Sequence, residues 1–345
     1  MLRILFLCSL LLVVGCQKKE LKENNDQQNK TAINVEDFLG NKIHLETPAK
    51  RVAVMFNPML DAMYMLDATE QIIAVPADTY TDSHVYNYLS KIDERVKNKS
   101  LPTPGISGNL NVESILVLQP DLVIAYNISE GVVKNLNAMK IPVYQAYSET
   151  YDDLQKEISD LGLLLGKEEK SRELLDFTIE KFKQIEEQSK NVTQKSAYFA
   201  WANGRIFSTT GTTSMMNQCM VFAGVRNVCT TPIDQPNINP ETFVSWNPDM
   251  VIMWNDSPNL FYQHKQLGAV NAVKNKQIYN LMPMFYYNPH TLKSLLTTIK
   301  IQNWAYEFST EEDIMNETAE ILKILYGEKN GEILFSELQN ELKTP

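Results

Sequence analysis

Apolar and polar positions alternate regularly along most of this chain, and one pattern occurs twice. Residues 109–127 read NLNVESILVLQPDLVIAYN and residues 237–255 read NINPETFVSWNPDMVIMWN, so matching positions are separated by a constant 128 residues. In each copy Glu113 or Glu241 opens about two turns of helix, which must end before the following proline. A β-branched apolar run comes next and predicts a strand buried on both faces. The duplication predicts two similar α/β lobes.

The pattern around the first copy predicts an N-terminal lobe over residues 33–165. Two alternating segments on either side of Gly40 predict a hairpin. Apolar runs separated by amphipathic helices predict that the rest of this lobe contains a mainly parallel sheet. The stretch from Asp78 to Gly108 is polar, and we expect it to be mobile.

A long amphipathic helix is expected over residues 166–192, between the lobes. Its apolar stripe includes Leu174, Phe182 and Ile185, and its other face is heavily charged. A helix of about 24 residues spans about 36 Å, which is enough to join two lobes as a strut. The alternation then resumes in a C-terminal lobe, residues 193–345. It ends in two predicted helices, residues 290–307 and 311–326, followed by a charged tail without a motif.

The first residues predict export. Residues 1–15 contain Arg3 and then an apolar run that is too short to span a bilayer, as in a signal peptide. The sequence Val-Val-Gly-Cys that ends at Cys16 is similar to a bacterial lipobox, so we expect Cys16 to carry a lipid anchor. The alternative is a signal peptide that happens to contain a cysteine. Residues 16–32 are polar and predict a flexible linker.

Composition and motifs exclude several classes of function. The net charge of −10 argues against nucleic acid as a partner, since neutralising phosphates requires a basic surface. The motifs HExxH, GxSxG, GxGxxG and the Walker glycine loop are all missing. Cys219 and Cys229 form either a disulfide or two buried thiols. No motif in the sequence therefore indicates catalysis, although the duplicated α/β pattern on its own would also suit a two-domain enzyme.

Aromatic and polar residues follow the predicted strands, where open parallel sheets place their ligands. Any single residue of this set could instead pack in the core. Because all of them follow strands, however, we expect the set as a whole to bind ligand. Aromatic rings would stack on a bulky chelate, and Arg205 would meet its anionic oxygens. His290 is a candidate to complete the coordination of a metal. The candidate ligand-binding residues are Tyr80, Tyr126, Tyr147, Trp201, Arg205, Trp254, Tyr286 and Tyr287.

The first repeat, N-x-E-x-I-L-x-L-x-P-D-L-V-I in outline, and the phrase R-V-x-V at residues 51–54 resemble the substrate-binding proteins of ABC importers for metal chelates. The resemblance extends from about Val35 to about Phe308. It implies two lobes joined by one backbone helix, with the ligand cleft between them and only modest closure. It also implies that Glu113 and Glu241 pair with arginines of the permease, in addition to stabilising their helices.

The resemblance implies capture of an extracytoplasmic metal chelate, with a ferric siderophore as the leading candidate. No intrinsic cofactor is expected, and Fe(III) or another chelated metal would arrive with the ligand. The partners would be an ABC permease with its ATPase subunits, and the membrane through the lipid anchor. The alternatives are haem, cobalamin, a nickel complex or an oxyanion as the ligand, an exported two-domain α/β enzyme, and a purely structural surface lipoprotein.

Overall fold

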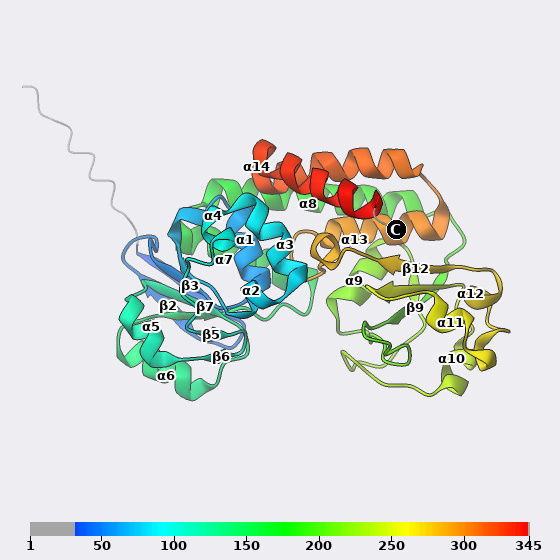
Figure 1. The fold of residues 1–345 in the computed structure, drawn as a ribbon, viewed down its shortest axis with the longest axis horizontal. Helices are drawn as coiled ribbons and strands as arrows, with labels where there is room; N and C mark the ends of the chain where they lie inside the picture. The colour runs from blue at the N-terminus through cyan, green and yellow to red at the C-terminus, as the bar shows by residue number, and fades with distance from the viewer. Residues whose placement is uncertain (1–31, 344–345) are drawn as a thin grey trace, which may run out of the picture. The chain divides into compact units, whose positions relative to one another are not determined.

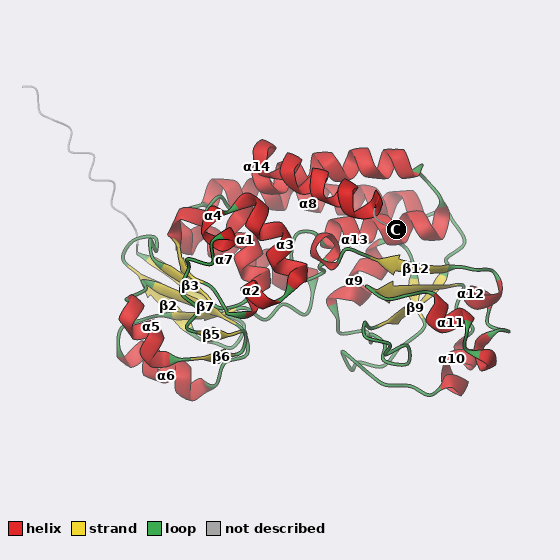
Figure 2. Cartoon of the chain, viewed as in Figure 1, coloured by secondary structure: helices red, strands yellow, loops and turns green. Residues whose placement is uncertain are grey.

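The computed structural model describes residues 32–343, and Figure 1 traces their order. The expected signal peptide, Cys16 and nearly all of the expected linker lie outside the described residues. The segment Ala32–Pro345 forms one compact unit. Figure 2 shows its alternation of helices and strands, which confirms the predicted α/β class with two lobes.

The N-terminal lobe begins with the predicted hairpin. Strands β1 (Ile33–Glu36) and β2 (Lys42–Leu45) pair antiparallel, and Gly40 adopts a φ of 79° in the turn, which suits a glycine. The main sheet is parallel, in the order β4 (Ile72–Ala74), β3 (Val52–Val54), β7 (Leu122–Ala125) and β8 (Val143–Gln145). Its helices are α1 (Asn57–Met65), α5 (Val112–Leu118), α6 (Glu130–Ala138) and α7 (Tyr151–Leu165). Short elements complete the lobe, namely η1 (Thr69–Gln71) and the paired strands β5 (Gly105–Ile106) and β6 (Asn109–Leu110).

The polar stretch after Asp78, expected to be mobile, is helical over most of its first twenty residues. They form three helices, α2 (Asp78–Thr81), α3 (Ser83–Ile92) and α4 (Glu94–Lys97). Asp82 and Asp93 cap the second and third helices, because their carboxylates accept the backbone N–H groups of His84 and Arg95. The caps and the packing of Leu89 and Val96 in the core stabilise these helices, of which α2 and α4 have only four residues each.

The C-terminal lobe repeats the design. Its sheet is also parallel, in the order β10 (Arg226–Asn227), β9 (Ser196–Ala200), β11 (Met250–Trp254) and β12 (Ile278–Leu281). The helical segments are α9 (Met215–Phe222), α10 (Pro240–Trp246), α11 (Asn259–Tyr262), η2 (Lys265–Leu267), α12 (Asn271–Lys274), η3 (Met284–Tyr287) and α13 (Ser294–Tyr306). In each lobe the strand of the repeated pattern, β7 or β11, lies third in the sheet.

The two repeat copies have the same local geometry. Asn111 caps α5 and Asn239 caps α10, each through its side-chain oxygen. The following aspartates act alike, because Asp121 accepts the backbone N–H of Arg51 and Asp249 accepts that of Ser196. Each carboxylate thereby ties the start of its own strand to the neighbouring strand. The duplication in the sequence therefore reflects a structural unit.

Two long helices contact elements of both lobes. The predicted strut is α8 (Glu168–Ser189), three residues shorter at its end than expected. The charged tail is not structureless, since α14 (Glu311–Lys343) continues through a break at Gly327, where φ is 77°. Beyond the break α14 packs on α3 of the N-terminal lobe, with Lys91 and Glu337 paired at 3.0 Å. Figure 1 shows α14 running beside α8.

A buried ion pair also joins the lobes. Lys293 at the start of α13 has only 1% of its side chain exposed, and its Nζ lies 2.8 Å from Asp61 of α1. The Tyr326 hydroxyl of α14 donates to the other carboxylate oxygen at 2.6 Å. The ammonium also sits 3.4 Å above the Phe285 ring. We refer to Asp61, Lys293 and Tyr326 as the interlobe triad.

The two cysteines of the C-terminal lobe are buried free thiols, so the disulfide alternative is wrong for this structure. Cys219 in α9 contacts the Ser294 carbonyl oxygen, with a sulfur-to-oxygen distance of 3.7 Å. Burial raises the pKa of Cys219 to about 12, so this thiol stays protonated and packs as a small apolar side chain.

Candidate ligand-binding site

A cavity of about 320 Å³ lies at the strand ends, with walls from both lobes. This volume falls within the range of small-molecule sites. Its walls combine aromatic rings with a few polar groups. The N-terminal lobe contributes Phe56, Pro58, Tyr126, Tyr147, Ser148 and Glu149, and the C-terminal lobe contributes Thr213, Ser214, Met215, Asp234 and His290.

Three aromatic rings form one wall. Phe56 follows β3, Tyr126 follows β7 and Tyr147 follows β8, which are neighbouring parallel strands. The ring centroids of Phe56 and Tyr126 are 4.6 Å apart, those of Tyr126 and Tyr147 are 6.0 Å apart, and all three rings are nearly parallel. We call these residues the aromatic wall. It presents ring surface to any flat or bulky ligand.

A buried carboxylate supports the loop at the end of the aromatic wall. Glu157 of α7 is fully buried, and its Oε1 accepts the backbone N–H of Tyr147. Burial raises the pKa of Glu157 to about 7, while the hydrogen bond from Tyr147 opposes this shift. The Glu157 side chain therefore fixes the loop that brings Tyr147, Ser148 and Glu149 to the cavity.

The opposite wall begins at the first residues of α9. Ser214 caps this helix by accepting the Asn217 backbone N–H at 3.1 Å, which holds residues 213–215 in place. The preceding turn lies so close to residues 231–233 that a Cβ on Gly211 would come within 1.9 Å of the Ile233 carbonyl oxygen. Only glycine fits there, and the close pairing of the two loops brings Asp234 to the cavity.

His290 lines the cavity from the segment before α13. Burial lowers the pKa of His290, and a hydrogen bond to the Ser148 backbone opposes this shift. The imidazole is therefore neutral near pH 7 and links the loops of the two lobes. A neutral imidazole can ligate a metal, but within residues 32–343 no three His, Cys, Asp or Glu side chains are grouped to hold a metal ion.

Two of the expected ligand-binding residues, Tyr126 and Tyr147, line this cavity, and Trp254 lines a separate cavity of about 90 Å³ beside the interlobe triad. Trp201 lines neither cavity, and its indole N–H donates to the Thr209 carbonyl at 2.8 Å. Arg205 is exposed elsewhere, with its Nε 3.2 Å from the Ala202 carbonyl oxygen. The expected anion partner is thus not at the site.

Three predicted tyrosines are structural. Tyr80 exchanges hydrogen bonds with the backbone of Leu101 through its hydroxyl. Tyr286 is completely buried and donates to the Leu334 carbonyl at 2.7 Å, and Tyr287 is buried in the same core cluster. The assignment of these tyrosines to the ligand site is corrected, because their hydroxyl or ring is occupied by packing within the protein.

The sequence interpretation missed much of the site. Phe56 and Glu149 also follow strands, so the rule that selected Tyr126 could have found both. Thr213, Ser214 and Asp234 lie in loops without periodicity, and only the close pairing of residues 211–214 with 231–234 brings them to the cavity.

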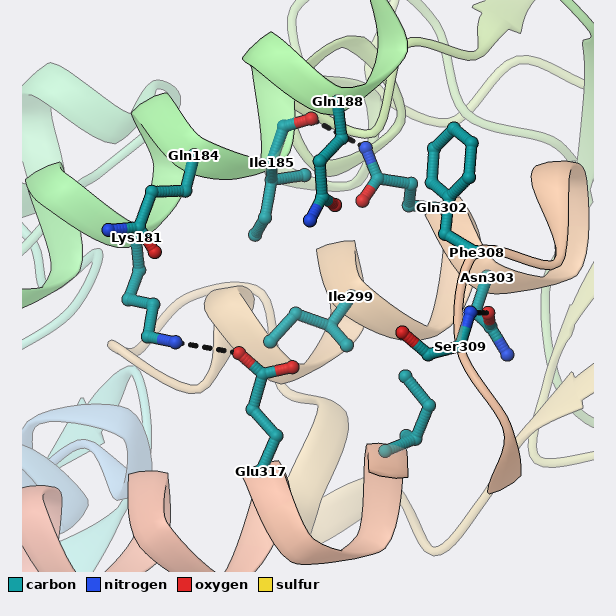
Figure 3. A pocket seen from close by; sticks show the side chains of 11 residues that line it. Lys181, Gln184, Ile185, Gln188, Ile299, Gln302, Asn303, Phe308, Ser309 and Glu317 are labelled. Atoms are coloured by element: carbon teal, nitrogen blue, oxygen red, sulfur yellow. Dashed lines mark hydrogen bonds and ion pairs between the residues drawn. The ribbon is translucent and has the colours of Figure 1, made fainter. Parts of the chain in front are cut away.

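Other hollows suit a chelate less well. Figure 3 shows one of about 60 Å³ between α8, α13 and the start of α14. Two of its polar side chains are already paired: Lys181 lies 2.7 Å from Glu317, and Gln302 donates to the Ile185 carbonyl. A groove of about 450 Å³ at the turn between α7 and α8 is lined mainly by charged side chains and contains no aromatic ring.

A model of the family described as periplasmic binding protein matches residues 52–284. The chain belongs to the periplasmic binding protein family. Members of this family act outside the cytoplasm and deliver substrates to an ABC permease and its ATPase subunits. This chain is therefore the substrate-binding component of an ABC importer. No helix within residues 32–343 has the length and apolar character needed to cross a membrane.

Relatives in the family differ in substrate. One relative is an uncharacterised ABC transporter substrate-binding lipoprotein of Bacillus subtilis, YvrC, with 23% sequence identity. The alignment covers 80% of this chain and 88% of the YvrC chain. The molybdate-binding protein MolA of Haemophilus influenzae is 22% identical, and the alignment covers 73% of this chain and 77% of the MolA chain. The MolA structure with molybdate has a TM-score of 0.72 at 19% identity and covers 85% of this chain and 97% of its own.

A third similar fold is that of Helicobacter pylori CeuE, solved as a nickel–histidine complex. Its TM-score is 0.69 at 18% identity, and the match covers 86% of this chain and 96% of that one. At these identities the structural likeness shows the fold alone. The two-lobed periplasmic binding protein architecture is therefore shown, whereas the substrate must be argued from the cavity.

Glu113 and Glu241 occupy equivalent exposed positions in this fold. Each lies in the first turn of its helix, α5 or α10. In the view of Figure 1, α5 and α10 both lie on the side away from α8 and α14. Among the ion pairs of residues 32–343, neither carboxylate has a basic partner. Both carboxylates are accessible to another protein.

Proposed function

We propose that this protein captures a metal chelate outside the cytoplasm, with a ferric siderophore as the leading candidate, and delivers it to an ABC permease. The observation that carries the proposal is the aromatic wall in a cavity of about 320 Å³ between the lobes. Flat aromatic surfaces suit the organic shell of a chelate better than a small bare ion. His290, which lines the same cavity, is proposed as a candidate to complete the coordination of the chelated metal, Fe(III) or another.

The cavity also bears on the alternatives. No lysine or arginine is among the described residues that line it, so it offers no cationic partner to an oxyanion such as molybdate. Haem, with its two carboxylates, would likewise meet no basic side chain. Cobalamin and a nickel complex remain the second candidates, because an apolar and aromatic wall can hold either one.

Two further parts of the proposal concern delivery. Cys16 lies outside the described residues and is proposed as the lipid anchor at the cell envelope, as its lipobox-like context predicts.

Glu113 and Glu241 are proposed to dock on the permease, one from each lobe. Their equivalent places on α5 and α10 support this, since a permease built from two similar halves would meet both lobes in the same way.

Titration of the soluble chain from residue 31 onward tests the proposal. The ligands are a ferric hydroxamate, a ferric catecholate, haem and cobalamin, and the signal is tryptophan fluorescence, because Trp254 lies at the edge of the neighbouring cavity. We expect saturable quenching by a ferric chelate. If only cobalamin binds, the siderophore proposal is wrong.

The lipid anchor is tested separately by immunoblotting membrane and soluble fractions of cells. We expect Cys16→Ala to release the protein from the membrane fraction, and continued membrane association would show that Cys16 is not the anchor.

A further inference from the structure

The cavity carries negative charge from both lobes. Glu149 lies in the loop after β8, and Asp234 lies in the loop that pairs with residues 211–214. The remaining titratable side chains of the lining are the tyrosines of the aromatic wall and His290, whose pKa is lowered by burial. Near pH 7 the walls therefore contain two acidic groups and no cationic group.

The two carboxylates act on the same space. Burial raises the pKa of Asp234, and the charge of Glu149 raises it further. The Tyr147 hydroxyl is hydrogen-bonded to Glu149 and is also within the field of Asp234. Glu149 and Asp234 therefore repel each other across the cavity, and a positive charge placed between them would relieve this repulsion.

The aromatic wall favours the same kind of ligand. The face of an aromatic ring carries negative charge density and attracts a cation. Tyr147 has 38% of its surface exposed, and it lies beside Glu149 at the end of the stacked rings. Ring faces and carboxylates thus line one cavity, so an ammonium or a cationic complex would meet complementary groups on both sides.

We infer that this cavity selects chelates that carry positive charge, with Glu149 and Asp234 binding that charge from opposite lobes. The inference rests on the proposed function and names the substrate class within it. A ferric hydroxamate with a free ammonium group has this character. A ferric tris-catecholate, with three negative charges, would be repelled by both carboxylates and would find no basic side chain in the lining.

A charge series of ferric chelates tests the inference. The probes are ferrioxamine B, a linear trihydroxamate complex with one positive charge, ferrioxamine E, its neutral cyclic counterpart, and ferric enterobactin, the tris-catecholate. Their affinities are measured by calorimetry on the folded chain and on the Glu149→Gln, Asp234→Asn and double variants. The matched control is Asp176→Asn with Glu186→Gln, which removes the same charge from the exposed face of α8.

We expect the cationic complex to bind most tightly and the tris-catecholate least. Each single substitution should weaken binding of the cation about tenfold and the double variant about a hundredfold, as expected for close charge pairs. Binding of the neutral complex should change less than threefold, and the control variant should match the native chain. Higher salt should weaken only the cationic complex.

The outcomes separate this inference from the proposed function. Equal or tighter binding of the tris-catecholate, or an unchanged affinity for the cation in the double variant, would overturn the charge selection and leave chelate capture intact. Failure of all three complexes to bind a folded chain, checked by circular dichroism, would overturn the proposed function and the inference with it.

Discussion

Glu157 shows how a single residue beneath the site couples folding to pH. Its pKa is raised from 4.5 to about 7 by burial, so the folded chain holds this proton more tightly than the unfolded chain. Its contribution to stability is therefore complete below about pH 4.5 and is lost as the pH rises to 7. The loss amounts to about 3 kcal/mol.

Glu157→Gln should remove this dependence. Between pH 5 and pH 8 the native chain should lose about 2.5 kcal/mol of its free energy of unfolding through this group, and we expect Glu157→Gln to avoid that loss. Urea denaturation at the two pH values measures it, with the exposed Glu186→Gln as the control. The same fall in both proteins would show that Glu157 is not the titrating group.

Residues at the strand ends show how far the sequence determines the site. Tyr126 and Tyr147 were predictable because parallel strands place their carboxyl ends at one edge of the sheet. Tyr80 and Tyr286 satisfy the same rule and yet pack within the protein, because Leu101 and Leu334 lie within hydrogen-bond distance of their hydroxyls. Such tertiary partners leave no local trace in the sequence.

Helices and strands also differ in how far the sequence predicts them. Helices α5 and α10 and the strands after them were predicted, because caps, prolines and apolar runs are local signals. The second half of α14 was not, since its stability depends on packing against α3, where Lys91 and Tyr88 pair with Glu337 and Glu341. A charged segment gives little sign of that contact.

The interlobe triad is a prediction at the scale of these elements. Lys293→Met leaves Asp61 as an uncompensated buried charge, and we expect it to lower the free energy of unfolding by about 3–5 kcal/mol. Asp61→Asn combined with Lys293→Met should cost much less than the two single variants together, because the amide still accepts the Tyr326 hydroxyl. Urea denaturation measures all three variants, and strictly additive costs would contradict a direct pair.

At the scale of the whole molecule, the two lobes that form the cavity are joined at several points. The strut α8, the tail of α14 and the interlobe triad join the lobes at separate points, as expected for a mostly preformed site. In the proposed delivery step, the permease recognises both lobes. This recognition was assigned to Glu113 and Glu241 by family resemblance and stays a prediction.

The double variant Glu113→Arg with Glu241→Arg tests delivery. It should abolish uptake of the radiolabelled ferric chelate into cells while leaving the affinity of the purified protein unchanged, because neither residue lines the cavity. Glu169→Arg with Glu186→Arg on α8 makes the same charge change away from α5 and α10 and should keep normal uptake. Normal uptake by the first variant would remove these carboxylates from the docking surface.

The most direct test of chelate capture is calorimetric titration of a ferric trihydroxamate into the native chain and two matched tyrosine variants. Tyr126→Ala removes the middle ring of the aromatic wall, whereas Tyr80→Phe removes a hydroxyl outside the cavity. We expect one bound chelate per native chain, at least tenfold weaker binding for Tyr126→Ala, and native affinity for Tyr80→Phe. Native affinity in Tyr126→Ala would contradict the cavity between the lobes as the binding site.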